Sequence, residues 1–160
     1  MLDRHVDISN RVLSGMDARV DIAQLKKLYT LGVRDFRRID LSGANLSGLV
    51  LDEVDLSGAN FKDADLRRVS LLGANLSYVD LSGANLRGAN LEHTNLTGAC
   101  LHRSHLDLAN LSHANLTDAD LRAATLRNAQ TLGVNLGEAG SLWGSVLPDG
   151  TTVTTHARSA

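Results

Sequence analysis

Histidine, cysteine and carboxylate side chains occur at several points where their spacing could support chemistry. The single cysteine, Cys100, lies two residues before His102, a spacing to weigh for a thiol activated by a neighbouring base. His93 directly follows Glu92, and His113 lies 20 residues further along, so a metal site is a second candidate. The glycines are spread along the chain rather than clustered before a helix, which argues against a phosphate-binding loop. Each candidate depends on which side chains the fold brings together.

The overall composition limits both the fold and the function. The chain has 160 residues, enough for one domain with a sizeable core. Apolar residues make up 43% but aromatic residues only 3%, which predicts a narrow and uniform interior built from Leu and Ala. A net charge of −2 gives no field strong enough to indicate nucleic-acid binding. One cysteine excludes an intrachain disulfide.

No targeting or membrane-spanning segment is expected. Residues 1–7 are charged and lack the apolar stretch of a signal peptide. No run approaches the roughly 18 apolar residues that suggest a membrane span. We therefore expect a cytoplasmic protein with no membrane partner.

A five-residue period dominates the sequence. Every fifth residue from Phe36 to Leu126 is Leu or Phe, which makes nineteen positions without a slip. Thr131 breaks this row and Leu136 resumes it in phase. A second row, two residues earlier, is mostly Ala and Val, and a row of mostly Asn and Asp lies between the two. The two residues after each Leu are mainly polar or Gly, so each pentad has two apolar positions and three polar ones.

This pattern fits neither a long helix nor a long strand. A helix would spread a five-residue repeat around its whole circumference. Two apolar residues at i and i+2 point to the same side of a short strand, and the next two residues break that alternation. A Ser-Gly pair there suits a type II turn, whose second central residue needs positive φ. Each pentad is therefore predicted to be a short strand followed by a corner.

The repeated segments resemble the pentapeptide-repeat proteins, with consensus A-(N/D)-L-x-x; residues 41–46 and 81–86 both read LSGANL. The resemblance covers residues 34–143, or 22 pentads, and implies an all-β fold, a right-handed quadrilateral parallel β-helix. Four pentads per coil would give about five and a half coils and a rod of about 26 Å at strand spacing. We predict an N-terminal segment with a capping helix (1–33), a repeat β-helix (34–143), and a C-terminal cap and tail (144–160).

Both ends carry signals for caps, because a bare solenoid end exposes apolar core and unpaired edges. A helix is predicted over residues 17–31, starting at Asp17 or Asp21 and ending at Gly32. We favour a cap over the first coil, with a partner-binding amphipathic helix as the alternative. The other end is predicted to close before a turn at 148–150, through four apolar residues: Leu142, Trp143, Val146 and Leu147.

The two ends also resemble those of cyanobacterial pentapeptide-repeat proteins. Residues 25–36 are similar to the segment that leads into their repeats, and residues 147–151 to the segment that leaves them. Because members of the family often pair through an end, the end that carries Trp143 could join two copies into a homodimer.

A coil of 20 residues, which the resemblance implies, predicts which side chains stack on one another. His93 and His113 become neighbours at one corner, but a third ligand is lacking, so plain surface histidines are favoured over a metal site. Asp35 over Asp55 would pair two carboxylates, which without a cleft we interpret as a solvated ladder. Four asparagines would form a second ladder: Asn75, Asn95, Asn115 and Asn135. His102 belongs to the corner after Cys100, so it is not expected to activate that thiol. With these candidates set aside, we predict no catalytic residue, no metal, no cofactor and no enzymatic activity.

Arginines are predicted to gather at one corner, with Asp107 interposed, and an acidic corner lies next to it (Asp52, Glu53, Glu92). The basic corner holds four residues that we predict to bind a partner: Arg67, Arg68, Arg87 and Arg127. Like charges stacked in adjacent coils, as at 67 and 87, should cost a few tenths of a kcal/mol, which suggests an external anionic partner. The alternative is that these charges serve only solubility and edge protection.

Three function classes follow. We favour a non-enzymatic protein–protein interaction module, a rigid solenoid that binds an unidentified protein through an outer face and acts in regulation. A branch of the family implies the alternative, a DNA-mimic modulator of DNA gyrase or topoisomerase. Such a mimic should be strongly acidic, yet residues 34–143 carry ten Lys and Arg against thirteen Asp and Glu, a net charge of −3. An enzyme has the least support, and neither a small-molecule substrate nor direct nucleic-acid binding is expected.

Overall fold

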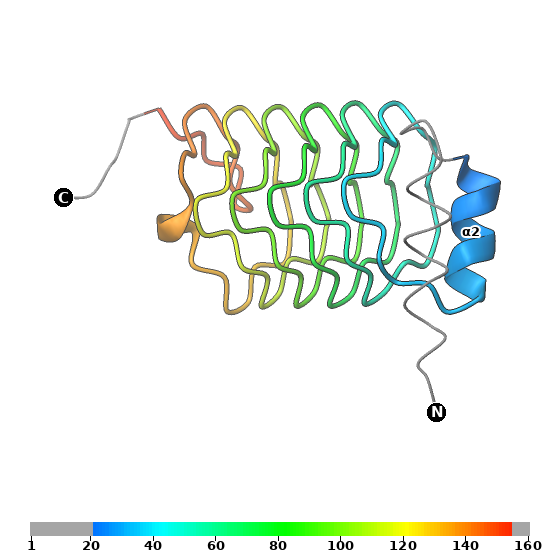
Figure 1. Cartoon of the computed structure of the whole chain (residues 1–160). Coiled ribbons are helices and arrows are strands. Elements are labelled where there is room, and N and C mark those ends of the chain that lie inside the picture. The colour runs from blue at the N-terminus through cyan, green and yellow to red at the C-terminus, as the bar shows by residue number, and fades with distance from the viewer. Residues whose placement is uncertain (1–20, 155–160) are drawn as a thin grey trace.

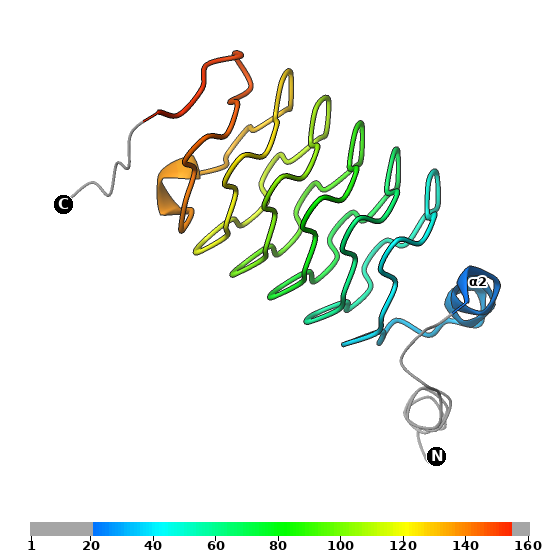
Figure 2. The ribbon, with the colours of Figure 1, turned by 90° about the horizontal axis from the view of Figure 1, so that it is seen from above.

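A computed structural model describes residues 21–154 as a stack of coils with a helix at one end (Figure 1). Parallel bridges join residues 20 positions apart, from Asp35↔Asp55 through Asn110↔Gln130. Each coil therefore takes four pentads, and the coils follow one another along a single axis when viewed from above (Figure 2). Within the described range the bridges are isolated, so each pentad contributes one bridging residue rather than an extended strand.

Every pentad turns at the two residues that follow its central Leu or Phe. In many corners the next amide closes a β-turn, as when Ala44 N–H donates to the Leu41 carbonyl at 3.0 Å. The second corner residue has φ between 55° and 71° up to Gly133, as a type II turn requires. Glycine fills eight of these corners, but Tyr78 (φ 58°) and Leu108 (φ 63°) adopt the same conformation. A left-handed backbone costs a non-glycine residue roughly 1 kcal/mol or more, so stacking must stabilise those corners.

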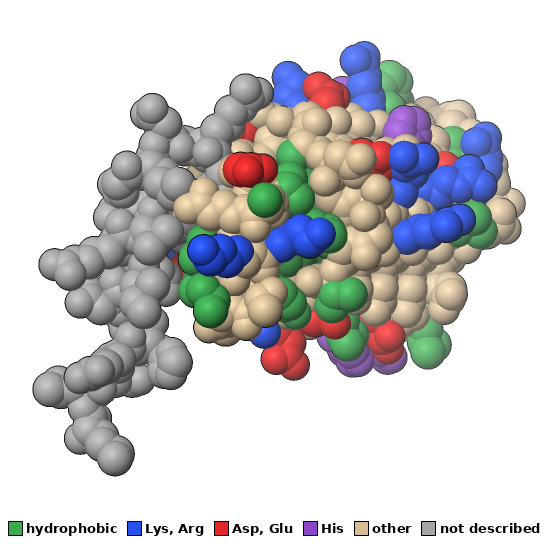
Figure 3. All heavy atoms as spheres, turned by 90° about the vertical axis from the view of Figure 1, so that its right-hand side faces the viewer, with side chains coloured by type: hydrophobic (Ala, Val, Ile, Leu, Met, Phe, Trp, Pro, Cys, Tyr) green, Lys and Arg blue, Asp and Glu red, His purple; other side chains and the backbone are tan. Residues whose placement is uncertain are grey.

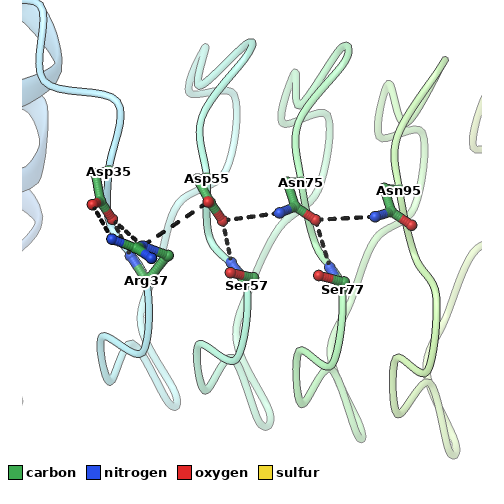
Figure 4. Close-up of polar contacts among 7 residues, drawn as sticks. All are labelled: Asp35, Arg37, Asp55, Ser57, Asn75, Ser77 and Asn95. Carbon is green, nitrogen blue, oxygen red and sulfur yellow. Dashed lines mark hydrogen bonds and ion pairs between the residues drawn. The ribbon is translucent and has the colours of Figure 1, made fainter.

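The Asn/Asp row stabilises the corners through Asx turns. The side-chain oxygen of each such residue accepts the backbone N–H two residues further on. Figure 4 shows this for Asp55, which accepts from Ser57 at 2.9 Å, and for Asn75, which accepts from Ser77 at 3.2 Å. Only a short side chain that ends in an oxygen acceptor can reach this amide, which explains why Asn and Asp dominate the row.

Where the row lacks Asn or Asp, a carboxylate of the preceding coil can take over. At Ser70, the N–H of Leu72 donates to Asp52 Oδ1 at 3.1 Å, and the Ser70 hydroxyl donates to the same oxygen at 2.5 Å. Thr125 repeats the arrangement, because its hydroxyl donates to Asp107 at 2.9 Å. The acidic side chains at 52 and 107 are therefore parts of the fold as well as surface charges.

The predicted Asn ladder is shorter than expected. Asn95 donates to Asn75 at 3.2 Å, and Asn75 donates to Asp55 at 3.1 Å, as the dashed lines in Figure 4 show. Asn135 instead donates to Glu138 at 2.8 Å. It does so because the backbone leaves the coil register here and forms a short 3-10 helix, η1 (Leu136–Glu138).

The interior is the predicted apolar column. Leu66, Leu86 and Leu106 are each at most 1% exposed and belong to one continuous cluster, which confirms that the five-residue row faces a shared core. The small row beside it also holds the buried polar residues Thr94 and Ser104. Their hydroxyls donate to carbonyl groups three residues earlier, at 2.7 and 2.8 Å, so these buried polar groups are satisfied.

Helix α2 (Ile22–Thr30) packs at the start of the stack (Figure 1). Asp21 is its N-cap and accepts the N–H of Ala23 at 3.2 Å, so one of the two predicted starts is observed. Asp17, the other predicted start, lies outside the described residues. Leu25 and Leu28 are buried in the core cluster, as a cap requires. Backbone bonds of a Schellman motif close the helix just before Gly32, whose φ is 90°.

The far end closes with a one-residue slip and a hairpin. After η1 the bridges span 21 residues instead of 20, as in Thr125↔Val146. The coil pairing continues to Pro148, whose carbonyl accepts the Asn128 N–H at 2.9 Å. The chain then turns at 148–150, and Thr152 pairs antiparallel with Val146. The returning segment thus occupies the open edge of the last coil.

Candidate partner-binding edge

The four predicted arginines lie on one edge of the rod, where the third pentad of each coil turns into the fourth. Bridges at 65, 85, 105 and 125 place positions 67, 87, 107 and 127 one above another, with position 68 beside them. All four arginine side chains are exposed. The end-on view of Figure 3 shows several Lys and Arg side chains close together on its right-hand side, with further Lys and Arg on the near end and the upper rim, and acidic and His side chains side by side on the lower rim.

A groove of about 580 Å³ lies on this edge. Its floor includes Gly88, which leaves a gap between the side chains of Arg68 in the coil before and Leu108 in the coil after. A Cβ atom at Gly88 would lie 3.7 Å from Cγ of Arg68, so that arginine lies along the gap. The groove is lined by seven residues: Ser47, Gly48, Arg67, Arg68, Arg87, Gly88 and Leu108. Arg127 does not line it, so three of the four predicted residues meet and the fourth does not.

Arg67 is already neutralised by its own coil. Its Nη2 and Nε lie 2.6 and 2.8 Å from the two carboxylate oxygens of Asp65, a bidentate ion pair. This hydrogen bond holds the pKa of Asp65 below its usual range and raises the pKa of Arg67. The predicted repulsion between Arg67 and Arg87 overlooked this pair, which compensates the charge at 67.

The other three arginines have no such partner among the described residues. Within residues 21–154, no carboxylate oxygen lies within 4.0 Å of the guanidinium nitrogens of Arg68, Arg87 or Arg127. Asp107, the acidic residue of this edge, is held by the Thr125 hydroxyl and by the backbone N–H of Arg127 at 2.9 Å. Within the described part of the chain, the groove therefore presents two uncompensated positive charges, at positions 68 and 87.

The stacked histidines lie as predicted but do not build a metal site. The rings of His93 and His113 stack with centroids 5.0 Å apart and planes 11° apart. Glu92 lies 3.9 Å from Nε2 of His93, and its other oxygen accepts from Asn110 at 3.2 Å. No three His, Cys, Asp or Glu side chains converge on a metal-sized point between residues 21 and 154.

The surroundings of the cysteine and of the paired carboxylates are described by residues 21–154. Among the described residues Cys100 is a free cysteine. The Nδ1 atom of His102 is buried and has no hydrogen-bond partner there, so it makes no hydrogen bond to the Cys100 thiol. Arg37 lies between the two stacked carboxylates, 2.7 Å from Asp35 and 4.0 Å from Asp55 (Figure 4). Its hydrogen bond lowers the pKa of Asp35. Sequence reasoning missed this pairing, although the spacing Asp-x-Arg at 35, 65 and 120 signals it.

Comparisons with known proteins agree on the architecture. The pentapeptide repeats family profile matches eight copies, over residues 35–73, 74–112 and 104–139. Rfr23, a pentapeptide repeat protein from the cyanobacterium Cyanothece 51142, is 28% identical, with a TM-score of 0.57 over 69% of this chain and 93% of that one. The pentapeptide repeat protein alr5209 from Nostoc Pcc 7120 is 36% identical, with a TM-score of 0.52 over 76% and 91%. The search of curated proteins found no match.

Coils of four pentads, each with one corner, wound around an apolar column define a β-solenoid. This chain belongs to the pentapeptide repeat family, whose profile covers most of its length. Between residues 21 and 154 it has no helix with the length and apolar character needed to cross a bilayer. A 36% identical pentapeptide repeat protein (TM-score 0.38, 60% of this chain and 72% of that one) comes from the Arabidopsis thaliana thylakoid lumen.

Proposed function

We propose that this chain is a non-enzymatic interaction module, a rigid solenoid that binds an acidic protein partner through its basic edge and acts in regulation. The observation that carries the proposal is the pair of guanidinium groups of Arg68 and Arg87, which face one groove and lack a carboxylate partner within residues 21–154. Charges left uncompensated on a rigid surface favour a partner that compensates them. Right-handed, quadrilateral winding with about five and a half coils belongs to the same proposal, and the 20-residue pairing supports its four pentads per coil.

A pull-down from cell extract, followed by identification of the bound proteins, tests the proposal. Arg68→Glu combined with Arg87→Glu should abolish capture of an acidic partner without changing the circular dichroism spectrum, because both side chains are exposed. Arg103→Glu is the matched control, since Arg103 is also exposed and has φ of 57°, close to the 55° of Arg68, on another corner. A partner retained equally by all three proteins would show that this edge is not the binding surface.

The gyrase alternative is weaker on electrostatic grounds. A duplex mimic needs a dense track of negative charge, whereas the repeat region has a net charge of −3 and an edge with uncompensated arginines. We expect neither inhibition nor protection of gyrase in a supercoiling assay at micromolar concentrations of this protein. Protection against a gyrase inhibitor would favour the mimic instead.

Homodimerisation through the C-terminal end and a cytoplasmic location complete the proposal. Leu132 (71% exposed) and Trp143 (48% exposed) lie on the last coil and give that end an apolar character. Light scattering of Leu132→Glu against the unchanged chain tests the dimer. A mass that is monomeric for both proteins would remove it.

A further inference from the structure

The proposed function does not say which segment of the partner is bound. The groove at Gly88 indicates the chemical class of that segment. We infer that this groove receives an extended acidic peptide segment that carries a hydrophobic residue next to its carboxylates. The inference rests on the proposed function and adds to it the class of ligand. It follows from three features, namely the charge of the groove, its apolar wall and the acidic residue that interrupts the basic edge beside it.

The charge of the groove selects carboxylates. Its lining holds three arginines and no acidic residue. Arg67 is occupied by Asp65, so the available charges are those of Arg68 and Arg87, which come from neighbouring coils about 4.8 Å apart. Alternate side chains of an extended peptide are about 7 Å apart and adjacent ones closer, so two carboxylates near each other in sequence can each reach a flexible arginine.

The apolar wall selects a hydrophobic neighbour for those carboxylates. Leu108 is 48% exposed and lies on the groove. Its positive φ of 63° is a conformation shared by the other corners, so the feature that sets Leu108 apart is its exposed apolar side chain at a groove lined by arginines. An exposed apolar side chain beside such a groove is a candidate for ligand contact. Burying this side chain against an apolar residue of the ligand would strengthen binding.

The interruption of the basic edge favours a short peptide over a nucleic acid. A phosphate backbone would need a continuous basic track, but Asp107 stands between Arg87 and Arg127 on this edge. A free inorganic anion would use the charges and leave Leu108 without a role. A peptide of a few residues matches all three features.

Amide chemical shifts of the isotope-labelled full chain test the inference. The probe is a synthetic peptide, acetyl-Gly-Ser-Glu-Glu-Leu-Ser-Gly-amide, and its counterpart with Gln in place of both Glu is the control. We expect shifts at Gly48, Gly88 and Leu108 and none at Gly43 or Gly83, which occupy the same turn position on another corner. The Gln peptide should bind at least about tenfold more weakly, as expected when charge-assisted bonds are lost.

Variants separate the contributions of charge and apolar contact. Arg68→Gln with Arg87→Gln should weaken peptide binding at least about tenfold, and Leu108→Ala severalfold, while Arg103→Gln leaves it unchanged. Failure of the peptide to shift Gly88, while pull-down of a partner still requires Arg68 and Arg87, would overturn the peptide and leave the proposed function standing. If the peptide does not shift Gly88 and the pull-down does not require Arg68 and Arg87, both the peptide inference and the proposed function would be wrong. Equal or tighter binding of duplex DNA or inorganic phosphate at the same amides would also refute the peptide.

Discussion

Replacing Asp52 tests whether a carboxylate of one coil completes a turn of the next. Asp52→Ala removes the acceptor for the Leu72 N–H, at 3.1 Å, and for the Ser70 hydroxyl, at 2.5 Å. Hydrogen bonds to charged groups contribute about 1.5–3 kcal/mol each, and partial exposure to water reduces this value. We therefore expect the free energy of unfolding to fall by about 1–2 kcal/mol in total.

A second substitution should restore what Asp52→Ala removes. Position 70 is the Asn/Asp-row position of its pentad, as position 75 is of the next. An Asn at 70 should therefore accept the Leu72 N–H as Asn75 accepts the Ser77 N–H, at 3.2 Å. In the Asp52→Ala background it should recover most of the lost stability. In the unchanged chain it should have little effect, because the turn amide at Leu72 already has its acceptor.

Urea unfolding followed by circular dichroism, applied to all four proteins of this cycle, measures the coupling. The pair Asp107→Ala and Thr125→Asn gives an independent repeat of the test, since Asp107 accepts from the Thr125 hydroxyl at 2.9 Å. If Ser70→Asn stabilised the unchanged chain and the Asp52→Ala chain equally, the two sites would be uncoupled and the borrowed-acceptor interpretation would be wrong.

Three further outcomes are expected. Leu86→Ala should lower the free energy of unfolding by about 3 kcal/mol, seen as an earlier urea midpoint, because the side chain is fully buried. Gly98→Ala should lower the melting temperature more than Gly48→Ala does: both impose positive φ on Ala, but only at Gly98 would the new Cβ meet a tyrosine ring, at 2.6 Å. Asp65→Asn should lose a small part of the stability at pH 7, and the difference from the unchanged chain should shrink as the pH is lowered. The lowered pKa of Asp65 means that its pairing with Arg67 stabilises the fold above the unfolded pKa and is lost as pH falls through the folded one.

The coil and its interior could be predicted from the sequence because the five-residue row is a local pattern repeated without interruption. The slip at η1 could not, because Leu136 stands in phase in the sequence although the backbone leaves the coil there. The roles of Asp52 and Asp107 were also hidden, since their hydrogen-bond partners lie 18 to 20 residues away. An Asn/Asp row is visible in a sequence, but the acceptors that replace its missing members appear only once coils are stacked.

The candidate site divides in the same way. Stacking at 20-residue intervals correctly placed the four arginines on one edge. The groove itself depends on the missing side chain at Gly88 and on the course of Arg68 beside it, which no periodicity specifies. The pairing of Arg67 with Asp65 lay within reach, because the two residues are two positions apart and recur in the same spacing elsewhere.

The closing hairpin also has a consequence for how such a rod can lengthen. Thr152 lies antiparallel to Val146, so a new coil added after the slip would find the edge at Val146 already paired. Tandem duplication of 20 residues upstream of Leu136, where every coil has the same register, would leave this closure intact. The rod would therefore lengthen by insertion of coils between its two ends, and the closing hairpin would keep its structure. A duplication on the C-terminal side of Leu108 would leave the distance between the groove and helix α2 unchanged.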